Sequence, residues 1–237
     1  MGSLLRTAGA PKSALDLIHS VCSSCAVCRQ WQRPSSKAVH STRTSTRFNE
    51  CLQIDLLFVL THILVHMCDE CTRFSMACLI ENKQPESITA AIASRWIAYF
   101  GSPEVIMSDK EGGIASEIGS VWAERMRTSI RLKAVGQHAS TVERHNALLR
   151  DVIHKILGQL QTENLEVGIE EFVASAVVAK NSMLEYGGHA PYTAVLGRIS
   201  PVLQGLDETS VSALDDAAPG PARHCSRLRE IAVQAVV

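Results

Sequence analysis

The sequence predicts an α/β protein in which helices flank a mixed five-stranded sheet. Three apolar segments of strand length follow one another after residue 50, separated only by short turns, which is typical of antiparallel strands. Two further short apolar segments each follow a helical pattern, and two longer helical patterns come after them. The resulting order β-β-β-α-β-α-β-α-α indicates one sheet with helices on its faces.

Runs of apolar and β-branched residues predict the first three strands, and residues that begin and end a helix predict the first helix. Pro85 opens an amphipathic pattern, and Gly101, followed by Pro103, ends it. The three strands are expected at residues 51–60 (CLQIDLLFVL), 62–70 (HILVHMCDE) and 73–80 (RFSMACLI).

The later elements complete the sheet and add helices. Ser140 or Thr141 can cap the first of the two long helices. We expect strands at 104–108 and 130–134, and helices at 114–126, from 140 or 141 to about 160, and at 168–184.

Three regions are predicted. Residues 1–45 form a basic arm with a short helix near 14–25 and a Ser/Thr-rich linker, residues 46–205 form the folded core, and residues 206–237 form a tail of low order.

Composition excludes several protein classes. The chain has 237 residues, 46% of them hydrophobic and 20% charged, which is typical of a globular protein and not of a disordered one. The net charge is −1, but residues 1–50 hold seven Lys or Arg and only two acids, so this arm is a candidate contact for nucleic acid or a solvated flexible segment. No apolar run reaches the roughly 20 residues needed to cross a membrane, and we expect no signal peptide.

Three carboxylates are candidates for a metal site. Asp55 interrupts the first buried strand, Asp109 directly follows the fourth, and Glu143 lies in the first turn of the long helix. Each has an ordinary alternative: an edge-strand acid, a turn acid and a helix-capping acid, respectively. If the three converge, mutual repulsion favours a hard cation such as Mg²⁺ or Mn²⁺ among them.

Five segments within residues 46–203 carry a family resemblance. They are LQIDLLFV, HILVHMCDECTRFSMACLIENK with its D-x-x-(S/T)-R turn, WIAYFGSPEVIMSDKEGG, GQHASTVERHNALLR with G-x-x-E-R-x-N, and PYTAVLGRISP. In this combination and order they resemble the catalytic core of retroviral and retrotransposon integrases, which has the ribonuclease H-like fold.

The resemblance assigns roles to named positions. It implies that Asp55, Asp109 and Glu143 are the catalytic, metal-binding triad, whereas Asp69 belongs to the turn motif. The interval of 33 residues between Asp109 and Glu143 is shorter than the family's usual one, which would select His145, but the E-R-x-N context favours Glu143. Candidate DNA contacts on the same helix, or solvated side chains, are Arg144, Arg150, His154 and Lys155.

The cysteines suggest a shortened zinc module. In the family a His pair precedes C-x2-C, and the matching cysteines here are Cys25 and Cys28, with only His19 upstream. A set of His19, Cys22, Cys25 and Cys28 on one helix would fan around its axis instead of enclosing a tetrahedron, so we do not expect zinc to be needed. Cys68 and Cys71 form another C-x2-C, which we interpret as buried thiols.

The sequence therefore predicts a retroelement integrase core, a Mg²⁺-dependent polynucleotidyl transferase or endonuclease. Its expected partners are DNA and further copies of the chain, and its expected location is intracellular, nuclear in a eukaryote. The alternatives are a non-catalytic nucleic-acid-binding or dimerising remnant of the same fold and, more remotely, another nuclease.

Overall fold

A computed structural model describes residues 6, 9–24, 45–109, 113–132, 141–200 and 220–236. These divide into two compact units, residues 40–150 and residues 1–39 with 151–237. Helix α7 (Thr141–Thr162) contributes its first ten residues to the former and the remainder to the latter. The three predicted regions and their boundaries remain a prediction.

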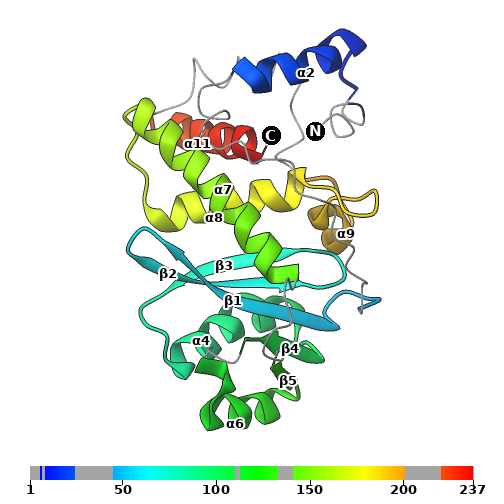
Figure 1. The fold of residues 1–237 in the computed structure, drawn as a ribbon, viewed down its shortest axis with the longest axis vertical. Coiled ribbons are helices and arrows are strands. Elements are labelled where there is room, and N and C mark those ends of the chain that lie inside the picture. Colours follow the sequence, from blue (N-terminus) through cyan, green and yellow to red (C-terminus); the bar gives the residue numbers. More distant parts are fainter. Residues whose placement is uncertain are drawn as a thin grey trace. The chain divides into compact units, whose positions relative to one another are not determined.

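The unit of residues 40–150 is built on the predicted five-stranded mixed sheet (Figure 1). The strand order is β3-β2-β1-β4-β5, with antiparallel pairing among β1, β2 and β3 and parallel pairing of β1 with β4 and of β4 with β5. The strands are β1 (Cys51–Val59), β2 (His62–Asp69), β3 (Ser75–Ile80), β4 (Val105–Ser108) and β5 (Ser129–Leu132).

Helices α4 (Pro85–Ile92) and α6 (Glu117–Met126) pack against each other beside the sheet (Figure 1). The predicted first helix is divided into α4, a π-helical segment η1 (Ala93–Ile97) and α5 (Ala98–Phe100). A short turn of helix, η2 (Gly113–Ala115), precedes α6. Predicted helix ends at Gly101 and after Met126 are therefore close to the observed ones.

An aromatic cluster fixes the end of this helical segment to the start of the core. The fully buried Trp96 packs against Phe48, Phe74 and Phe100, with ring centroids 5.1–6.3 Å apart. Its indole N–H donates to Asn49 at 2.8 Å, so the largest side chain of the core keeps its one polar atom satisfied.

The other unit is helical. It contains α2 (Lys12–Ser24), the later turns of α7, α8 (Ile169–Met183), α9 (Pro191–Leu196) and α11 (Gly220–Val236). Along α7 the predicted apolar stripe is buried throughout: Val142, Leu149, Val152, Ile153, Ile156 and Leu160.

Residues 220–236, within the segment for which a tail of low order was predicted, form a helix. This segment is helix α11, which packs against α8. Its buried residues Leu228, Ile231, Ala232 and Ala235 follow helical spacing. Two of the four are alanines and none is aromatic, so the apolar stripe is weak in the sequence although it packs closely in the structure.

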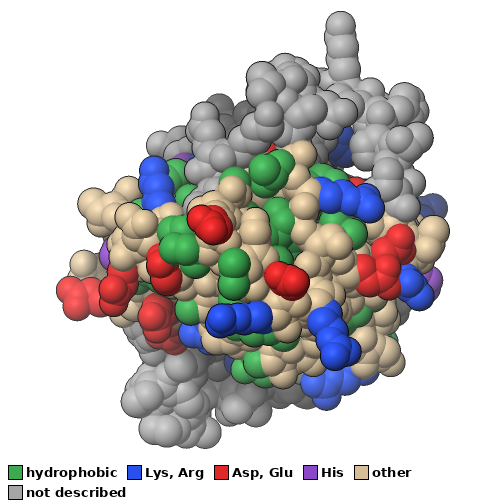
Figure 2. Space-filling model, turned by 90° about the horizontal axis from the view of Figure 1, so that it is seen from below, with side chains coloured by type: hydrophobic (Ala, Val, Ile, Leu, Met, Phe, Trp, Pro, Cys, Tyr) green, Lys and Arg blue, Asp and Glu red, His purple; other side chains and the backbone are tan. Residues whose placement is uncertain are grey.

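Among the described helices, none is both long and apolar enough to pass through a membrane. The face shown in Figure 2 has Lys and Arg side chains interspersed with Asp and Glu around scattered apolar groups. This face therefore offers no broad surface of one charge.

Candidate active site

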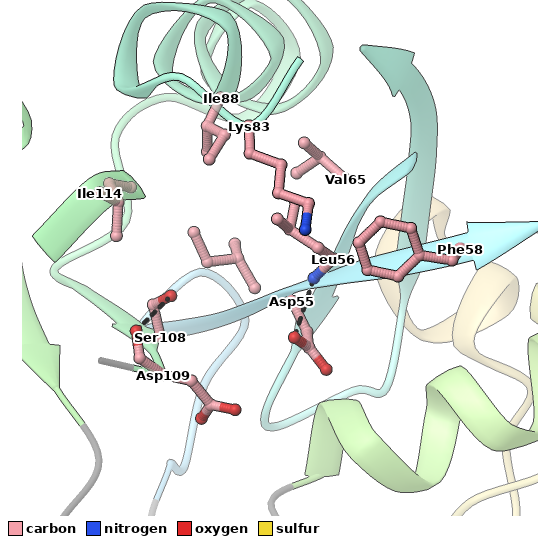
Figure 3. Close-up of a pocket in the computed structure, with 10 residues that line it drawn as sticks. Asp55, Leu56, Phe58, Val65, Lys83, Ile88, Ser108, Asp109 and Ile114 are labelled. Atoms are coloured by element: carbon pink, nitrogen blue, oxygen red, sulfur yellow. Dashed lines mark hydrogen bonds between the residues drawn. The ribbon is translucent and has the colours of Figure 1, made fainter. Parts of the chain in front are cut away.

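Two aspartates, Asp55 and Asp109, lie just beyond the paired segment of β1 and β4. The parallel register pairs Cys51 with Val105 and Gln53 with Met107. Asp55 lies two residues beyond Gln53 on β1, and Asp109 lies two residues beyond Met107, directly after the end of β4. Both line one pocket of about 170 Å³, and Figure 3 shows their carboxylates on the same side of it. The parallel pairing of β1 with β4 thus brings together residues that are 54 positions apart in the chain.

Asp55 is held by two hydrogen bonds. The backbone N–H of Leu56 donates to Oδ1 at 2.8 Å, and the side-chain amide of Asn146 donates to Oδ2 at 2.6 Å. Asp55 is half-buried, so water is partly excluded from the carboxylate. Its two oxygens are therefore fixed in orientation before any cation binds.

Asn146 is a site residue to which the sequence analysis gave no role. It occupies the last position of E-R-x-N, one helical turn after Glu143, and is only 5% exposed. Its side-chain oxygen contacts Nδ1 of His66, which is fully buried on β2. The His66 ring thus fixes which way the amide points, and the amide NH₂ faces Asp55. His66 is opposite Asp55 in the β1–β2 register, a pairing that only the folded sheet defines.

Glu143 lies in the first turn of α7, as predicted, and is half-buried. The start of this helix is anchored to the sheet unit at two points. The backbone N–H of Val142 donates to Gln53 on β1 at 3.1 Å, and the Arg73 guanidinium donates to the Thr141 hydroxyl. These bonds hold the turn that carries Glu143 beside the strand that carries Asp55.

His145 points into the protein. It is 1% exposed, whereas Glu143 two residues earlier keeps access to solvent. The helix therefore presents the carboxylate, and not the imidazole, at its accessible face.

The Asp69 carboxylate stabilises the β2–β3 turn. It accepts hydrogen bonds from the backbone N–H of Thr72 at 2.6 Å, from the Thr72 hydroxyl at 2.7 Å and from the backbone N–H of Asn49 at 2.9 Å. Burial raises its pKa, and these donors act against that rise. Its oxygens are committed to the turn, in agreement with its assignment to the turn motif.

The remaining predicted residues fall into two groups. Along α7, Arg144 is exposed, while Arg150, His154 and Lys155 are half-buried. Cys25 and Cys28 lie outside the described residues, as do the side chains of His19 and Cys22. Cys68 is a buried free thiol and Cys71 a half-buried one.

The described residues present a pair of carboxylates, not a closed metal cage. In the part of the chain that the structure describes, no three His, Cys, Asp or Glu side chains are grouped closely enough to hold a metal ion. Asp55 and Asp109 share the pocket and Glu143 is not among its lining residues. Two carboxylates with open positions between them are nevertheless the donor type that fits Mg²⁺ or Mn²⁺.

The solved structures that resemble this chain include two from retroviral integrases. The catalytic core domain of BIV integrase matches with a TM-score of 0.52 and 16% identity, covering 63% of this chain and 95% of that one. This chain has the ribonuclease H-like fold of a retroviral integrase core. A chain of the simian T-cell lymphotropic virus intasome, solved in complex with the PP2A regulatory subunit B56 gamma, matches with a TM-score of 0.62 and 18% identity, covering 81% of this chain and 67% of that one. No protein-family model and no curated protein matches the sequence.

Proposed function

We propose that this chain is a retroelement integrase core that binds DNA and catalyses metal-dependent phosphodiester cleavage and strand transfer. The observation that carries the proposal is that Asp55, in the middle of β1, and Asp109, directly after β4, line one pocket. The sequence motifs around both residues resemble those of the integrase triad. The integrase-like fold supports the same reaction class.

Each residue has a distinct role in this proposal. Asp55 and Asp109 would hold Mg²⁺ or Mn²⁺, and Glu143 would complete the site from the first turn of α7. When bound, such ions activate an attacking oxygen and stabilise a leaving oxygen in phosphodiester chemistry. Asn146 keeps the Asp55 carboxylate oriented through its 2.6 Å hydrogen bond.

The DNA partner would meet helix α7 as well as the pocket. The exposed Arg144 starts a set of cationic or titratable side chains that continues with Arg150, His154 and Lys155. We propose that these contact phosphates, that the active form is a homo-oligomer, and that the protein acts inside the cell, in the nucleus of a eukaryotic host. One resembling chain belongs to an intasome, which is consistent with DNA and further copies as partners.

The test is joining and cleavage of labelled DNA duplexes with Mg²⁺ or Mn²⁺. We expect wild-type protein to form product and Asp109→Asn and Glu143→Gln to lose more than about 100-fold, because even the outer-shell partners of metal ligands are worth about 10–100-fold. His145→Gln should retain most of the activity. Glu117→Gln is a matched control, since Glu117 is an exposed acid in the first turn of another helix, α6.

Two outcomes would contradict the proposal in different ways. A dead His145→Gln beside an active Glu143→Gln would overturn the third triad position. A wild-type protein that binds DNA but gives no product with any divalent metal would support the non-catalytic alternative.

A further inference from the structure

The pocket that holds the two aspartates is also lined by an exposed aromatic ring. Phe58 lies on β1 between the buried Leu57 and Val59, yet it is 49% exposed. Single exposed apolar residues are common and need no function. Phe58 differs because it lines the same pocket as Asp55 and Asp109, although the interval of three residues along β1 directs its side chain to the opposite face of the strand from that of Asp55.

A lysine lies over one face of this ring. Lys83 precedes α4, and its ammonium nitrogen is 4.6 Å from the centroid of the Phe58 ring. It is exposed and also lines the pocket (Figure 3). The cation–π contact holds the ammonium at this pocket, where it remains exposed to solvent.

The chemistry of this arrangement matches one nucleotide of a DNA strand. A base can stack on an aromatic face, and a lysine ammonium neutralises a phosphate. Apart from Ser108 and the three charged residues, the lining consists of apolar side chains, among them Ile54, Val65, Ile88 and Ile114. A flat, weakly polar base suits such a wall, whereas the phosphate needs the cation at its edge.

We infer that Phe58 and Lys83 form a nucleotide-binding subsite beside the acidic pair, with the base stacked on Phe58 and the adjoining phosphate bound by Lys83. The inference rests on the proposed function, because the reacting phosphodiester would lie at Asp55 and Asp109. Stacking on a phenyl ring does not distinguish bases, so this subsite holds the strand without selecting its sequence.

The experiment measures DNA binding instead of catalysis. Full-length protein is titrated against a fluorescein-labelled duplex with a short single-stranded end, in Ca²⁺ and at several salt concentrations. We expect Phe58→Leu to weaken binding about 5- to 150-fold, the equivalent of losing roughly 1–3 kcal/mol of stacking. Lys83→Gln should lower the slope of log affinity against log salt by about one.

Matched controls and a base-removal series make the test specific. Tyr99→Leu removes another exposed aromatic residue and Arg125→Gln another exposed cation, both outside the pocket lining, and neither should change binding. Phe58→Tyr keeps the ring and should bind like wild type. Removing bases one position at a time should identify one nucleotide whose base matters to wild type and not to Phe58→Leu.

The results separate this inference from the function it rests on. If wild type binds and cleaves DNA while Phe58→Leu and Lys83→Gln bind with unchanged affinity and salt slope, the subsite is refuted and the integrase proposal stands. If wild type binds no DNA, both are refuted. Should Phe58→Leu fail to fold, Lys83→Gln together with Phe58→Tyr still decides the matter.

Discussion

The hydrogen-bonded series His66–Asn146–Asp55 gives the sharpest quantitative prediction. Asn146→Ala removes one bond to a carboxylate and one to a buried imidazole. A hydrogen bond to a charged group is worth about 1.5–3 kcal/mol and a neutral one about 0.5–1.5 kcal/mol. Because Asp55 is only half-buried and water can replace its lost donor, we expect a total cost of about 2–3 kcal/mol in the free energy of unfolding.

The cost can be measured by urea unfolding and by thermal melts followed by circular dichroism. At about 2–4 °C per kcal/mol for a chain of this size, the expected loss is roughly 4–12 °C in Tm. Arg144→Ala, two residues earlier on the same helix and exposed, should change stability by less than about 0.5 kcal/mol.

Asn146→Asp tests the electrostatic side of the same contact. It would place a second carboxylate against Asp55, and two like charges 4 Å apart repel by about 4 kcal/mol at an effective dielectric constant of 20. We expect this variant to be less stable than Asn146→Ala in EDTA and to be stabilised by Mg²⁺ more than wild type. An Asn146→Ala protein within about 0.5 kcal/mol of wild type, or an Asn146→Asp protein unaffected by Mg²⁺, would refute the reasoning.

Three further predictions concern other parts of the chain. Hydrogen bonds from Arg227 lower the pKa of Glu163 to about 2. Glu163→Gln should therefore destabilise the helical unit at pH 7 by less than about 1 kcal/mol. Thermal melts should show that this difference vanishes as the pH falls from about 4.5 to about 2. Burial, assisted by a nearby carboxylate, raises the pKa of Cys51 to about 12. Iodoacetamide at pH 8 should therefore modify Cys51 more slowly than the half-buried Cys71. Mass spectrometry that shows the reverse order of modification would contradict this. Gly119→Ala should lower Tm despite the better helix propensity of alanine, because the added carbon would overlap a backbone oxygen of η2, and an unchanged or higher Tm would show that η2 shifts freely.

Local sequence patterns were sufficient for the strands and most of the helices. The run from Cys51 to Val59 is apolar and β-branched, and it forms a strand buried for most of its length. The three consecutive strands with short turns could pair only as neighbours, which is what the antiparallel β1–β2 and β2–β3 registers show. The pattern could not predict α11, because alanines give little contrast between the two faces of a helix.

The candidate site was only partly accessible to sequence reasoning. Asp55 and Asp109 each follow from a local motif, one within a strand and one directly after a strand. Asn146 and His66 could not be paired in advance, because they are 80 positions apart and only the β1–β2 register brings His66 opposite Asp55. The contact between Phe58 and Lys83 could not be predicted either, because Phe58 is on β1 and Lys83 precedes α4, and nothing in either local sequence indicates the other.

Glu70 and Asp55 are two acidic residues with different surroundings. Glu70 is buried and accepts hydrogen bonds from Ser45 and from the Gln53 amide, while the oxygen of that same amide accepts from Val142 at the start of α7. A carboxylate engaged in this way is a structural anchor, since removing it would release Gln53 and, through it, the helix start that carries Glu143. Asp55 differs because its surroundings orient it and yet leave it half-exposed at a pocket. The two carboxylates therefore differ in their surroundings: Glu70 helps to hold the start of α7, whereas Asp55 is oriented at a pocket.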